Sequence, residues 1–418
     1  MTAKNAFYAQ SGGVTAVINA SACGVIETAR KHSDKIAHVY AGRNGIIGAL
    51  TEDLIDTNQE SAEDIAALKT TPSGAFGSCR YKLKSLEDNR REYERLIEVF
   101  KAHNIGYFFY NGGGDSADTC FKVSQLSEKM GFPVQAIHVP KTVDNDLPIT
   151  DNCPGFGSVA KYIAVSSLEA SYDVRSMAKT STKVFVLEVM GRHAGWIAAA
   201  GGLIEDYGIP VVVLFPEVEF DQEKFLASVK AKVEQYGYVT IVVSEGTHWP
   251  DGRFLAEQGT RDDFGHAQLG GAAPVVANMI KEALGYKFHW AVADYLQRAA
   301  RHLASKSDVE QAYALGEAAV NMALEGHNSI MPTVVRESSA PYKWNIGMAP
   351  LSEVANVEKM MPMEYITEDG FGITDGCKEY LYPLIQGEAY PEYDANGMPR
   401  YVTMKGIAVP RKLADFEV

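Results

Sequence analysis

The sequence predicts an α/β fold with mostly parallel sheets, and three features of its patterning support this. Short, continuous apolar runs alternate along the chain with segments of helical periodicity, which is typical of parallel strands covered by helices on both faces. The alternation falls into two blocks, one before about Thr150 and one from about Val184. With 418 residues the chain is also too long for one ordinary core, so it fits two domains or one large body.

Seven apolar runs are expected as strands, because each is short and continuous. Four fall in the first block, at 6–9, 36–40, 107–110 and 134–139, and three in the second, at 184–189, 211–215 and 239–243. Between them, the spacing of apolar residues predicts helices over 16–31, 89–103, 115–130, 158–172, 221–236 and 308–325. Two polar, glycine-rich stretches, 247–271 and 387–401, are expected as loops.

The composition argues against several classes of protein. The net charge of −14 and the pI of about 5.2 argue against a role in binding nucleic acid, since an acidic surface repels phosphate backbones. The five cysteines are scattered and form no CxxC pair, which argues against a disulfide framework or zinc ribbon and favours a reducing, cytoplasmic location. No apolar leader is visible at the start, and the apolar runs are too short to span a membrane.

Glycine-rich motifs follow two of the predicted strands, where open parallel sheets bind their ligands. The first is Ser11-Gly12-Gly13, which leads from strand to helix and lets a ligand approach the backbone and a helix N-terminus. The second is the triple glycine 112–114, followed by Asp115 and by Ser116 as the expected N-cap. The first motif indicates a phosphate loop and the second a phosphate or metal site, and an ordinary tight turn is the alternative interpretation of each.

Charged residues follow two further strands. In KTVDND, Lys141 precedes Asp144 and Asp146. One carboxylate can take a proton from an attacking hydroxyl, another can hold magnesium, and the lysine offsets phosphate charge. In MGRHAG, Arg192 can bind phosphate through two hydrogen bonds, whereas His193, a lone histidine at a helix start, is expected to be structural. A solvated acidic turn is the alternative interpretation of KTVDND.

Motifs of other enzyme classes are missing or misplaced. The chain has no GK pair for a Walker A loop, no HExxH and no GxSxG. The segment 155–160, GFGSVA, matches the GxGxxA of an NAD-dependent dehydrogenase. It follows Asp-Asn-Cys-Pro instead of a strand, so a dinucleotide site is not expected there.

Taken in order, SGG, GGGDS, KTVDND and MGR resemble the motifs of the phosphofructokinase family over roughly residues 4 to 330. The resemblance implies two doubly wound, mostly parallel-sheet α/β domains with the active site in the cleft between them. The expected phosphoryl-donor domain is 1–154 with 299–340 returning to it, and the sugar-phosphate domain is 155–298. The segment 341–418 is expected to pack on the body or on a partner subunit. The family also implies Mg²⁺ as cofactor and a homodimer or homotetramer.

The resemblance implies a role for each residue that matches a family motif. Asp144 is the expected catalytic base for the sugar 1-hydroxyl, Thr142 a contact of the transferred phosphoryl group and Asp146 a magnesium-associated carboxylate. The expected catalytic groups are Asp144, Lys141, Thr142 and Arg192. The expected donor contacts are Gly13, Arg80, Asp115 and Lys141. The expected sugar contacts are Thr142, Asp144, Met190, Gly191, Arg192, Glu245, Tyr295 and Arg298. A neighbouring subunit is expected to reach the 6-phosphate through Lys183, with Lys287 or His289 as a second contact.

Two positions imply pyrophosphate as the donor. Users of ATP in the family carry glycine after the first aspartate of GGDGS and glycine before TIDND, whereas users of pyrophosphate carry aspartate and lysine. This chain has Asp115 and Lys141 there, and Gly114 where the family usually has aspartate. A register shifted by one residue would make Asp115 the metal-associated carboxylate and Ser116 the donor-selecting residue. Lys141 indicates pyrophosphate in either register.

The expected reaction is therefore the reversible conversion of fructose 6-phosphate and pyrophosphate into fructose 1,6-bisphosphate and phosphate. An ATP-dependent phosphofructokinase is the alternative within the class. A non-catalytic, sugar-phosphate-binding regulatory subunit is the alternative outside it, with Gly114 as its only hint. Sedoheptulose 7-phosphate stays open as a related acceptor.

Overall fold

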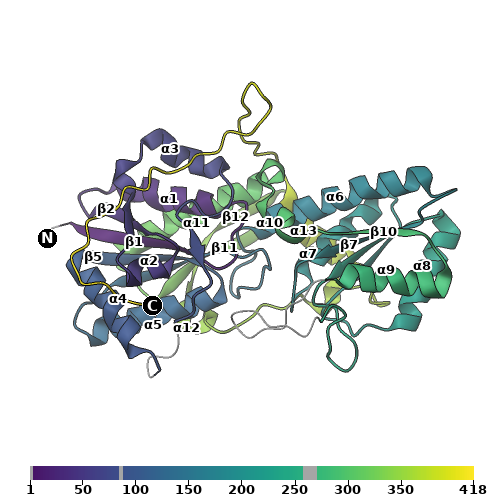
Figure 1. Cartoon of the computed structure of the whole chain (residues 1–418), viewed down its shortest axis with the longest axis horizontal. Helices are drawn as coiled ribbons and strands as arrows, with labels where there is room; N and C mark the ends of the chain where they lie inside the picture. Colours follow the sequence, from purple (N-terminus) through teal and green to yellow (C-terminus); the bar gives the residue numbers. More distant parts are fainter. Residues whose placement is uncertain (1–2, 84–87, 258–270) are drawn as a thin grey trace. The chain divides into compact units, whose positions relative to one another are not determined.

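The computed structural model describes residues 3–83, 88–257 and 271–418, and the chain forms two compact units (Figure 1). Unit 1 consists of Met1–Gly155, Arg301–Glu358 and Gly387–Val418, and unit 2 of Phe156–Ala300 and Lys359–Gln386. The units divide after 155 and 300, where the sequence analysis set boundaries at 154 and 298. The C-terminal segment that was expected over 341–418 is divided, because 359–386 belongs to unit 2.

Unit 1 is built on an eight-stranded sheet in the order β12-β11-β6-β5-β1-β2-β3, with β4 pairing with β1 off this path. Its strands are β1 (Lys4–Ser11), β2 (Ile36–Gly42), β3 (Leu54–Asp56), β4 (Ser78–Cys79), β5 (Ile105–Gly112), β6 (Gln135–Pro140), β11 (Ile330–Ser339) and β12 (Tyr342–Pro350). The outermost strands β3 and β12 pair antiparallel with their neighbours, and the strands between them are parallel.

Helices cover both faces of this sheet (Figure 1). One face carries α1 (Ile18–Lys31), α3 (Ala62–Ala67) and α11 (Lys306–Leu324), and the other carries α2 (Ile46–Leu50), α4 (Arg90–Ala102), α5 (Gly114–Lys129) and α12 (Leu351–Val354). The helices α1 and α11 meet at two glycines. A Cβ on Gly24 would lie 2.2 Å from Tyr313 O, and one on Gly316 would lie 2.2 Å from Ser21 O, so the two backbones approach too closely for any side chain there.

Unit 2 has a parallel four-stranded sheet in the order β10-β7-β9-β8. Its strands are β7 (Val184–Val189), β8 (Val211–Leu214), β9 (Val239–Ser244) and β10 (Phe288–Val292). Its helices are α6 (Phe156–Met177), α7 (Trp196–Gly201), α8 (Gln222–Tyr236), α9 (Ala272–Leu284), α10 (Asp294–Ala299) and α13 (Asp375–Leu381). The apolar side chains of α8 and α9 share one core with those of β7, β8 and β9, while α6 and α7 also contact the sheet.

The predicted strands and helices all form, with ends shifted by a few residues. The strands β3, β4, β10, β11 and β12 were not predicted. The predicted loop 387–401 contains no helix or strand, and the part of the other predicted loop from 258 to 270 lies outside the described residues. Across the described parts of the chain, we find no helix that is both long and apolar enough to cross a membrane.

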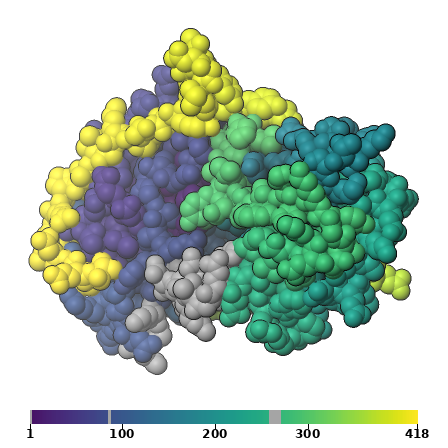
Figure 2. All heavy atoms as spheres, turned by 45° about the vertical axis from the view of Figure 1, so that its right-hand side comes forward, coloured from purple at the N-terminus to yellow at the C-terminus, as the bar shows by residue number. Residues whose placement is uncertain are grey.

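The last residues, 402–418, form a C-terminal strap that runs over unit 1 (yellow in Figure 2). Ala408 bridges Ile55 in antiparallel fashion. On either side of it, Asp56 N donates to Ile407 O over 2.9 Å, and Val409 N donates to Leu54 O over 2.8 Å. The strap therefore pairs with the outer edge of β3, which would otherwise be the free edge of the sheet.

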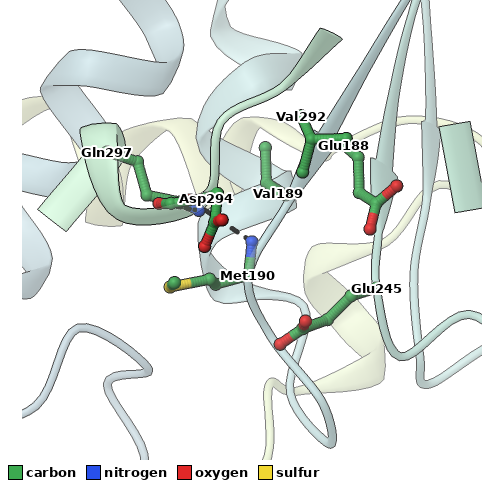
Figure 3. Close-up of a pocket in the computed structure, with 7 residues that line it drawn as sticks. All are labelled: Glu188, Val189, Met190, Glu245, Val292, Asp294 and Gln297. Carbon is green, nitrogen blue, oxygen red and sulfur yellow. Dashed lines mark hydrogen bonds between the residues drawn. The ribbon is translucent and has the colours of Figure 1, made fainter. Parts of the chain in front are cut away.

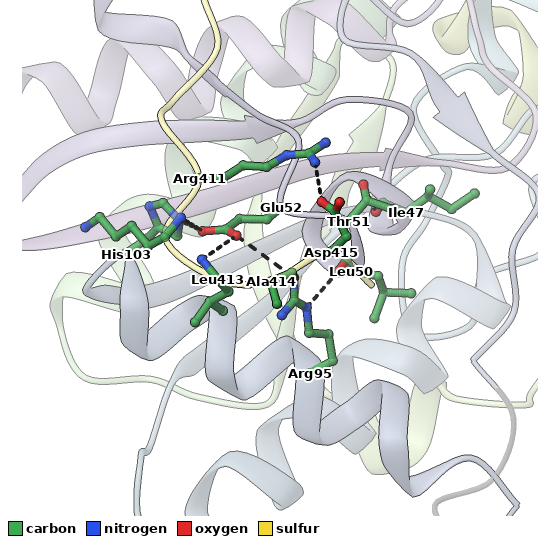
Figure 4. A network of polar contacts seen from close by, with 11 residues as sticks. Ile47, Leu50, Thr51, Glu52, Arg95, His103, Arg411, Leu413, Ala414 and Asp415 are labelled. Carbon is green, nitrogen blue, oxygen red and sulfur yellow. Dashed lines mark hydrogen bonds and ion pairs between the residues drawn. The ribbon is translucent and has the colours of Figure 1, made fainter. Parts of the chain in front are cut away.

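A buried carboxylate anchors the end of this strap (Figure 4). The side chain of Glu52 is fully buried and accepts hydrogen bonds from Lys412 N at 2.6 Å and Leu413 N at 3.0 Å. His103 Nε2 lies 2.6 Å from the same carboxylate, and Arg95 Nη2 donates to Ala414 O over 2.9 Å. Burial raises the pKa of Glu52, but these hydrogen bonds outweigh it and hold the pKa below its ordinary value.

Candidate active site

Three neighbouring parallel strands of unit 1 bring the predicted donor residues to one edge of the sheet. The strand β5 lies between β1 and β6, and all three run in the same direction. The segments 11–13, 112–116 and 141–146, which come at the carboxyl ends of these strands, therefore lie side by side. Lys141 N donates to Gly112 O over 3.0 Å and ties two of the segments together.

A short strand adds Arg80 to the same edge. In β4, Cys79 lies opposite Ser11 at the end of β1, and Gly12 N donates to Cys79 O over 3.0 Å. Arg80 is the next residue and is exposed. A guanidinium beside a glycine loop is well placed to bind a phosphate.

Lys141 is buried at this edge, with 4% of its surface exposed. Its Nζ would lie 3.5 Å from a Cβ added to Gly12, whose φ of +72° also favours glycine. The next residue of this loop, Gly13, also has no side chain. The two glycines let an anionic ligand come close to this ammonium group, so the position of Lys141 suits phosphate binding.

Ser116 has a different role from the predicted one. The helix α5 begins at Gly114, with Gly113 as its N-cap and no side-chain capping bond, so the prediction of Ser116 as N-cap is wrong. Its hydroxyl instead donates to Ser11 Oγ over 2.8 Å and joins the ends of β5 and β1. A Cβ on Gly114 would meet no atom of the described residues within 4 Å, at the position where family members usually carry a carboxylate.

Asp115 lies in the first turn of α5 and pairs with a residue that the sequence analysis missed. Lys82 Nζ donates to Asp115 Oδ1 over 2.6 Å. The side chains of both residues are about half exposed, at 45% for Lys82 and 59% for Asp115. The only sequence signal for Lys82 is its position two residues after Arg80.

Hydrogen bonds within the loop after β6 fix the backbone around Asp144. Asp144 N donates to Thr142 Oγ1 over 3.0 Å. The buried Asn145, which has a φ of +57°, accepts a hydrogen bond from Cys153 N at 2.9 Å. Asparagine tolerates this backbone conformation better than most residues. The half-buried Asp144 therefore lies on a loop whose shape is set on both sides of it.

Asp146 has a feature that fits a bound cation. Its Oδ1 is buried and accepts no hydrogen bond in the part of the chain that the structure describes. Burial and the charge of Glu358 raise the pKa of Asp146, although Lys141 acts in the opposite direction. A divalent cation would compensate the unpaired oxygen of Asp146. Within the described residues, no three His, Cys, Asp or Glu side chains form a metal cluster.

In unit 2, predicted sugar residues follow the carboxyl ends of two paired strands. Met190, Gly191 and Arg192 follow β7, and Glu245 follows β9. Gly191 N donates to Glu245 Oε1 over 3.4 Å. A pocket of about 100 Å³ opens beside them (Figure 3), lined by Glu188, Val189, Met190, Glu245, Val292, Asp294 and Gln297.

The environment of Glu245 favours its neutral form. Burial raises its pKa, and the charges of Glu188 and Asp294 act in the same direction, while the Gly191 N–H and Arg192 oppose them. A carboxyl group accepts hydrogen bonds, which suits sugar hydroxyls. Gln297, which the sequence analysis missed, accepts a hydrogen bond from Met190 N at 3.3 Å and holds the start of this segment.

Tyr295 and Arg298 lie on α10, which comes directly after β10. The Arg298 guanidinium stacks on the Tyr295 ring, 3.9 Å from its centre, and the tyrosine is 60% exposed. The stacking holds the guanidinium in one orientation. An oriented guanidinium recognises phosphate better than a freely rotating one. His193 is exposed.

Lys183 and Lys287 lie at the opposite end of the unit 2 sheet. They directly precede β7 and β10, whereas Met190 follows β7. Lys183 N donates to Lys287 O over 2.9 Å, and Lys183 Nζ donates to Ala178 O over 2.8 Å. A strand of this length spans about 20 Å, so these lysines cannot share a ligand with Met190 of the same chain. His289 lies within β10 and is exposed. Their role toward a neighbouring subunit stays a prediction.

Comparisons with known proteins agree on one family. The model of the family described as phosphofructokinase matches residues 5–323. The chain is 72% identical over 416 residues to the pyrophosphate–fructose 6-phosphate 1-phosphotransferase of Methylococcus capsulatus, with 99% of each chain covered. It is 67% identical over 420 residues to the enzyme of the same name from Halomonas elongata, with 100% of each covered. The crystal structure of a pyrophosphate-dependent phosphofructokinase from Nitrosospira multiformis matches with a TM-score of 0.93 at 71% identity, covering 99% of this chain and 100% of that one.

Proposed function

This chain belongs to the phosphofructokinase family, and on that basis we propose how its residues perform the reaction. The enzyme transfers a phosphoryl group from pyrophosphate to the 1-hydroxyl of fructose 6-phosphate, giving fructose 1,6-bisphosphate and phosphate, and the reaction is reversible. The proposal is supported by relatives named pyrophosphate–fructose 6-phosphate 1-phosphotransferase, whose sequences match this chain over its full length. One structural observation favours pyrophosphate: Lys141 is buried beside the glycine turn at Gly12.

Asp144 is the general base in this proposal. Its carboxylate takes the proton of the sugar 1-hydroxyl while the hydroxyl oxygen forms its bond to the transferred phosphorus. The bond from that phosphorus to the bridging oxygen breaks, and the leaving phosphate keeps the electron pair. The hydrogen bond from Asp144 N to Thr142 Oγ1 supports the role, because it fixes the backbone that carries the base.

Lys141, Thr142 and Arg80 stabilise the charge that develops on the phosphate groups. The ammonium of Lys141 is buried, where electrostatic interactions are stronger than in water. Asp146 would hold a divalent cation, and the bound cation would offset the negative charge of the pyrophosphate oxygens. The unpaired Oδ1 of Asp146 supports this assignment.

The sugar phosphate binds in unit 2 in this proposal. Glu245, Met190 and Gly191 contact the sugar, and Arg192 and Arg298 bind its phosphate, supported by the pocket beside Glu245 and by the stacked Arg298 guanidinium. Unit 1 is accordingly the donor domain and unit 2 the sugar-phosphate domain.

We further propose that the enzyme is a cytoplasmic homo-oligomer. The five free cysteines support a reducing compartment. The position of Lys183 at the far end of β7 supports a contact with a second subunit's ligand. Light scattering at working concentration tests this, because an active monomer would contradict the shared site.

A comparison of donors tests the proposed function. Purified enzyme is assayed with fructose 6-phosphate and Mg²⁺, with either pyrophosphate or ATP as donor. We expect turnover with pyrophosphate, release of phosphate in equal amount, and the reverse reaction from fructose 1,6-bisphosphate and phosphate. Turnover with ATP at a comparable kcat/KM would make the ATP-dependent alternative the better one. Sedoheptulose 7-phosphate is assayed in parallel as a second acceptor.

A further inference from the structure

The proposed mechanism does not use His138, a buried polar residue. It lies beside the donor edge, the edge of the unit 1 sheet where the segments 11–13, 112–116 and 141–146 meet. It lies on β6, three residues before Lys141 and opposite Tyr110 of β5. Because strand side chains alternate between faces, His138 shares its face with Ala136 and Tyr110, which belong to the core cluster that packs against α5. The imidazole is therefore on the sheet face that α5 covers, near the end of the sheet where α5 begins.

The imidazole of His138 makes no well-formed hydrogen bond. The residue is fully buried, and neither Nδ1 nor Nε2 reaches a partner at normal hydrogen-bond geometry among the described residues. Buried polar groups are normally paired, since an unpaired one loses its hydration without compensation. An apolar residue of similar volume would avoid this loss, so the presence of histidine needs a reason.

The nearest polar groups that act on the imidazole point to that reason. They are the hydrogen-bonding backbone groups of Gly112 and Gly113, which favour the charged ring, and the ammonium of Lys141, which opposes it. Burial is the largest effect and lowers the pKa of His138 to about 3. The ring is therefore neutral at neutral pH, with one N–H donor and one acceptor nitrogen.

The run 112–114 has no side chains, so its shape depends on backbone contacts alone. Gly112 O accepts Lys141 N at 3.0 Å, and Gly113 O accepts Ser116 N at 3.1 Å. A carbonyl oxygen has two lone pairs and can accept a further hydrogen bond. The amide groups of Gly114 and Asp115 precede the first hydrogen bond of α5 and can receive a phosphate.

We propose that His138 is a positioning residue of the donor site. Its N–H donates to the carbonyl of Gly112 or Gly113 when the donor is bound, and so holds the glycine turn in the shape that receives the phosphates. A neutral ring does this without placing a second positive charge beside Lys141. The inference rests on the proposed function, since the turn is taken to bind pyrophosphate.

The test compares His138→Leu, which removes the donor, with His138→Gln, which keeps an N–H group. We expect His138→Leu to raise the KM for pyrophosphate about tenfold, the effect of one hydrogen bond, while the KM for fructose 6-phosphate stays within twofold. His138→Gln should restore most of the loss. The control is His103→Gln, which alters another buried histidine of unit 1, paired with Glu52. It should leave the KM for pyrophosphate unchanged.

A second measurement does not depend on turnover. In wild-type enzyme labelled with ¹⁵N-histidine, magnesium pyrophosphate should shift the ring nitrogen resonances of His138 to those of a hydrogen-bonded neutral imidazole. An unchanged KM for pyrophosphate in folded His138→Leu, an equal rise of both KM values, or resonances that ignore pyrophosphate would each overturn the proposal. If His138→Leu does not fold, His138→Gln and the resonances decide it. A wild-type enzyme without pyrophosphate turnover would instead contradict the proposed function.

Discussion

Lys82 Nζ lies 2.6 Å from Asp115 Oδ1, so the carboxylate that was predicted to select the donor is paired with a cation. The pairing offsets part of the charge with which Asp115 would repel a third phosphate. Both side chains are about half exposed, so solvent screens the pair and it adds little to stability. Its importance lies in its position at the donor edge.

Removing Lys82 should therefore change donor binding more than it changes stability. We expect Lys82→Ala to raise the KM for pyrophosphate several-fold, because the donor then meets an uncompensated Asp115, and to leave ATP unused. Asp115→Gly should admit some ATP. Steady-state kinetics with both donors measure this. A Lys82→Ala enzyme with the wild-type KM would show that the pair does not face the donor.

Asp144→Asn should reduce kcat by about 10² to 10⁴, the usual loss for a general base, while the KM for fructose 6-phosphate changes little. The matched control lies in the same segment. Asp151 pairs with Arg336, with Asp151 Oδ2 and Arg336 Nη2 3.0 Å apart, and Asp151→Asn should lower stability without lowering kcat per folded molecule. Near-normal turnover of Asp144→Asn would remove this residue from the role of base.

Arg298→Ala should raise the KM for fructose 6-phosphate at least tenfold and the KM for pyrophosphate by less than twofold. The reason is that a stacked guanidinium binds a phosphate through several hydrogen bonds. Arg253→Ala is the control, because Arg253 is an exposed arginine of unit 2 paired with Asp251. Equal effects of the two substitutions would indicate a general loss of positive charge.

The burial of His138 also predicts a dependence of stability on pH. Its pKa falls from an ordinary 6.5 to about 3 in the folded chain, so the unfolded chain binds the proton first. The stability contribution is complete above pH 6.5 and is lost as the pH falls toward 3. Between pH 6.5 and 5 the loss is about 2 kcal/mol, at 1.36 kcal/mol per pH unit. Denaturant unfolding at pH 7 and pH 5 should show this loss in the wild type and a smaller one in His138→Gln. Equal losses in both would contradict it.

Glu52→Ala should detach the C-terminal strap. The substitution leaves Lys412 N and Leu413 N without their acceptor and removes the partner of His103. Breaking a buried charged network of this kind costs about 3 kcal/mol or more. Unfolding midpoints and protease cleavage within 402–418 measure the effect. Asp53→Asn, which alters a surface ion pair with Arg43, should cost less than about 1 kcal/mol and leave the strap protected.

The sequence was most informative where a strand that is covered by helices on both faces leads into a loop of glycines or charged residues. The strands β1, β5 and β6 are continuous apolar runs, and the structure brings the polar segments at their ends to one edge of the sheet. The strands β10 and β12 were missed because they are edge strands whose side chains, apart from Ala349, are exposed or only partly buried. Such strands have no continuous apolar signal.

Other features of the site needed coordinates. Ser116 fits the pattern of an N-cap, but the helix starts two residues earlier and the hydroxyl bonds to Ser11. The pairing of Lys82 with Asp115 joins the segment after β4 to the first turn of α5. The unpaired Oδ1 of Asp146 is a property of packing. Local sequence encodes none of these, because each depends on which segments the sheet brings together.

The order in which the chain is synthesised bears on the strap at β3. Unit 1 takes its parts from the beginning, the middle and the end of the chain, as 1–155, 301–358 and 387–418. When β1 to β6 leave the ribosome, α1 has no α11 to cover it, and the outer edge of β3 is unpaired. Each is completed only by residues that are made later, and the strap is made last. Unit 1 is therefore the first unit to be synthesised and the last to be completed. An interrupted translation product keeps an unpaired sheet edge, which promotes aggregation.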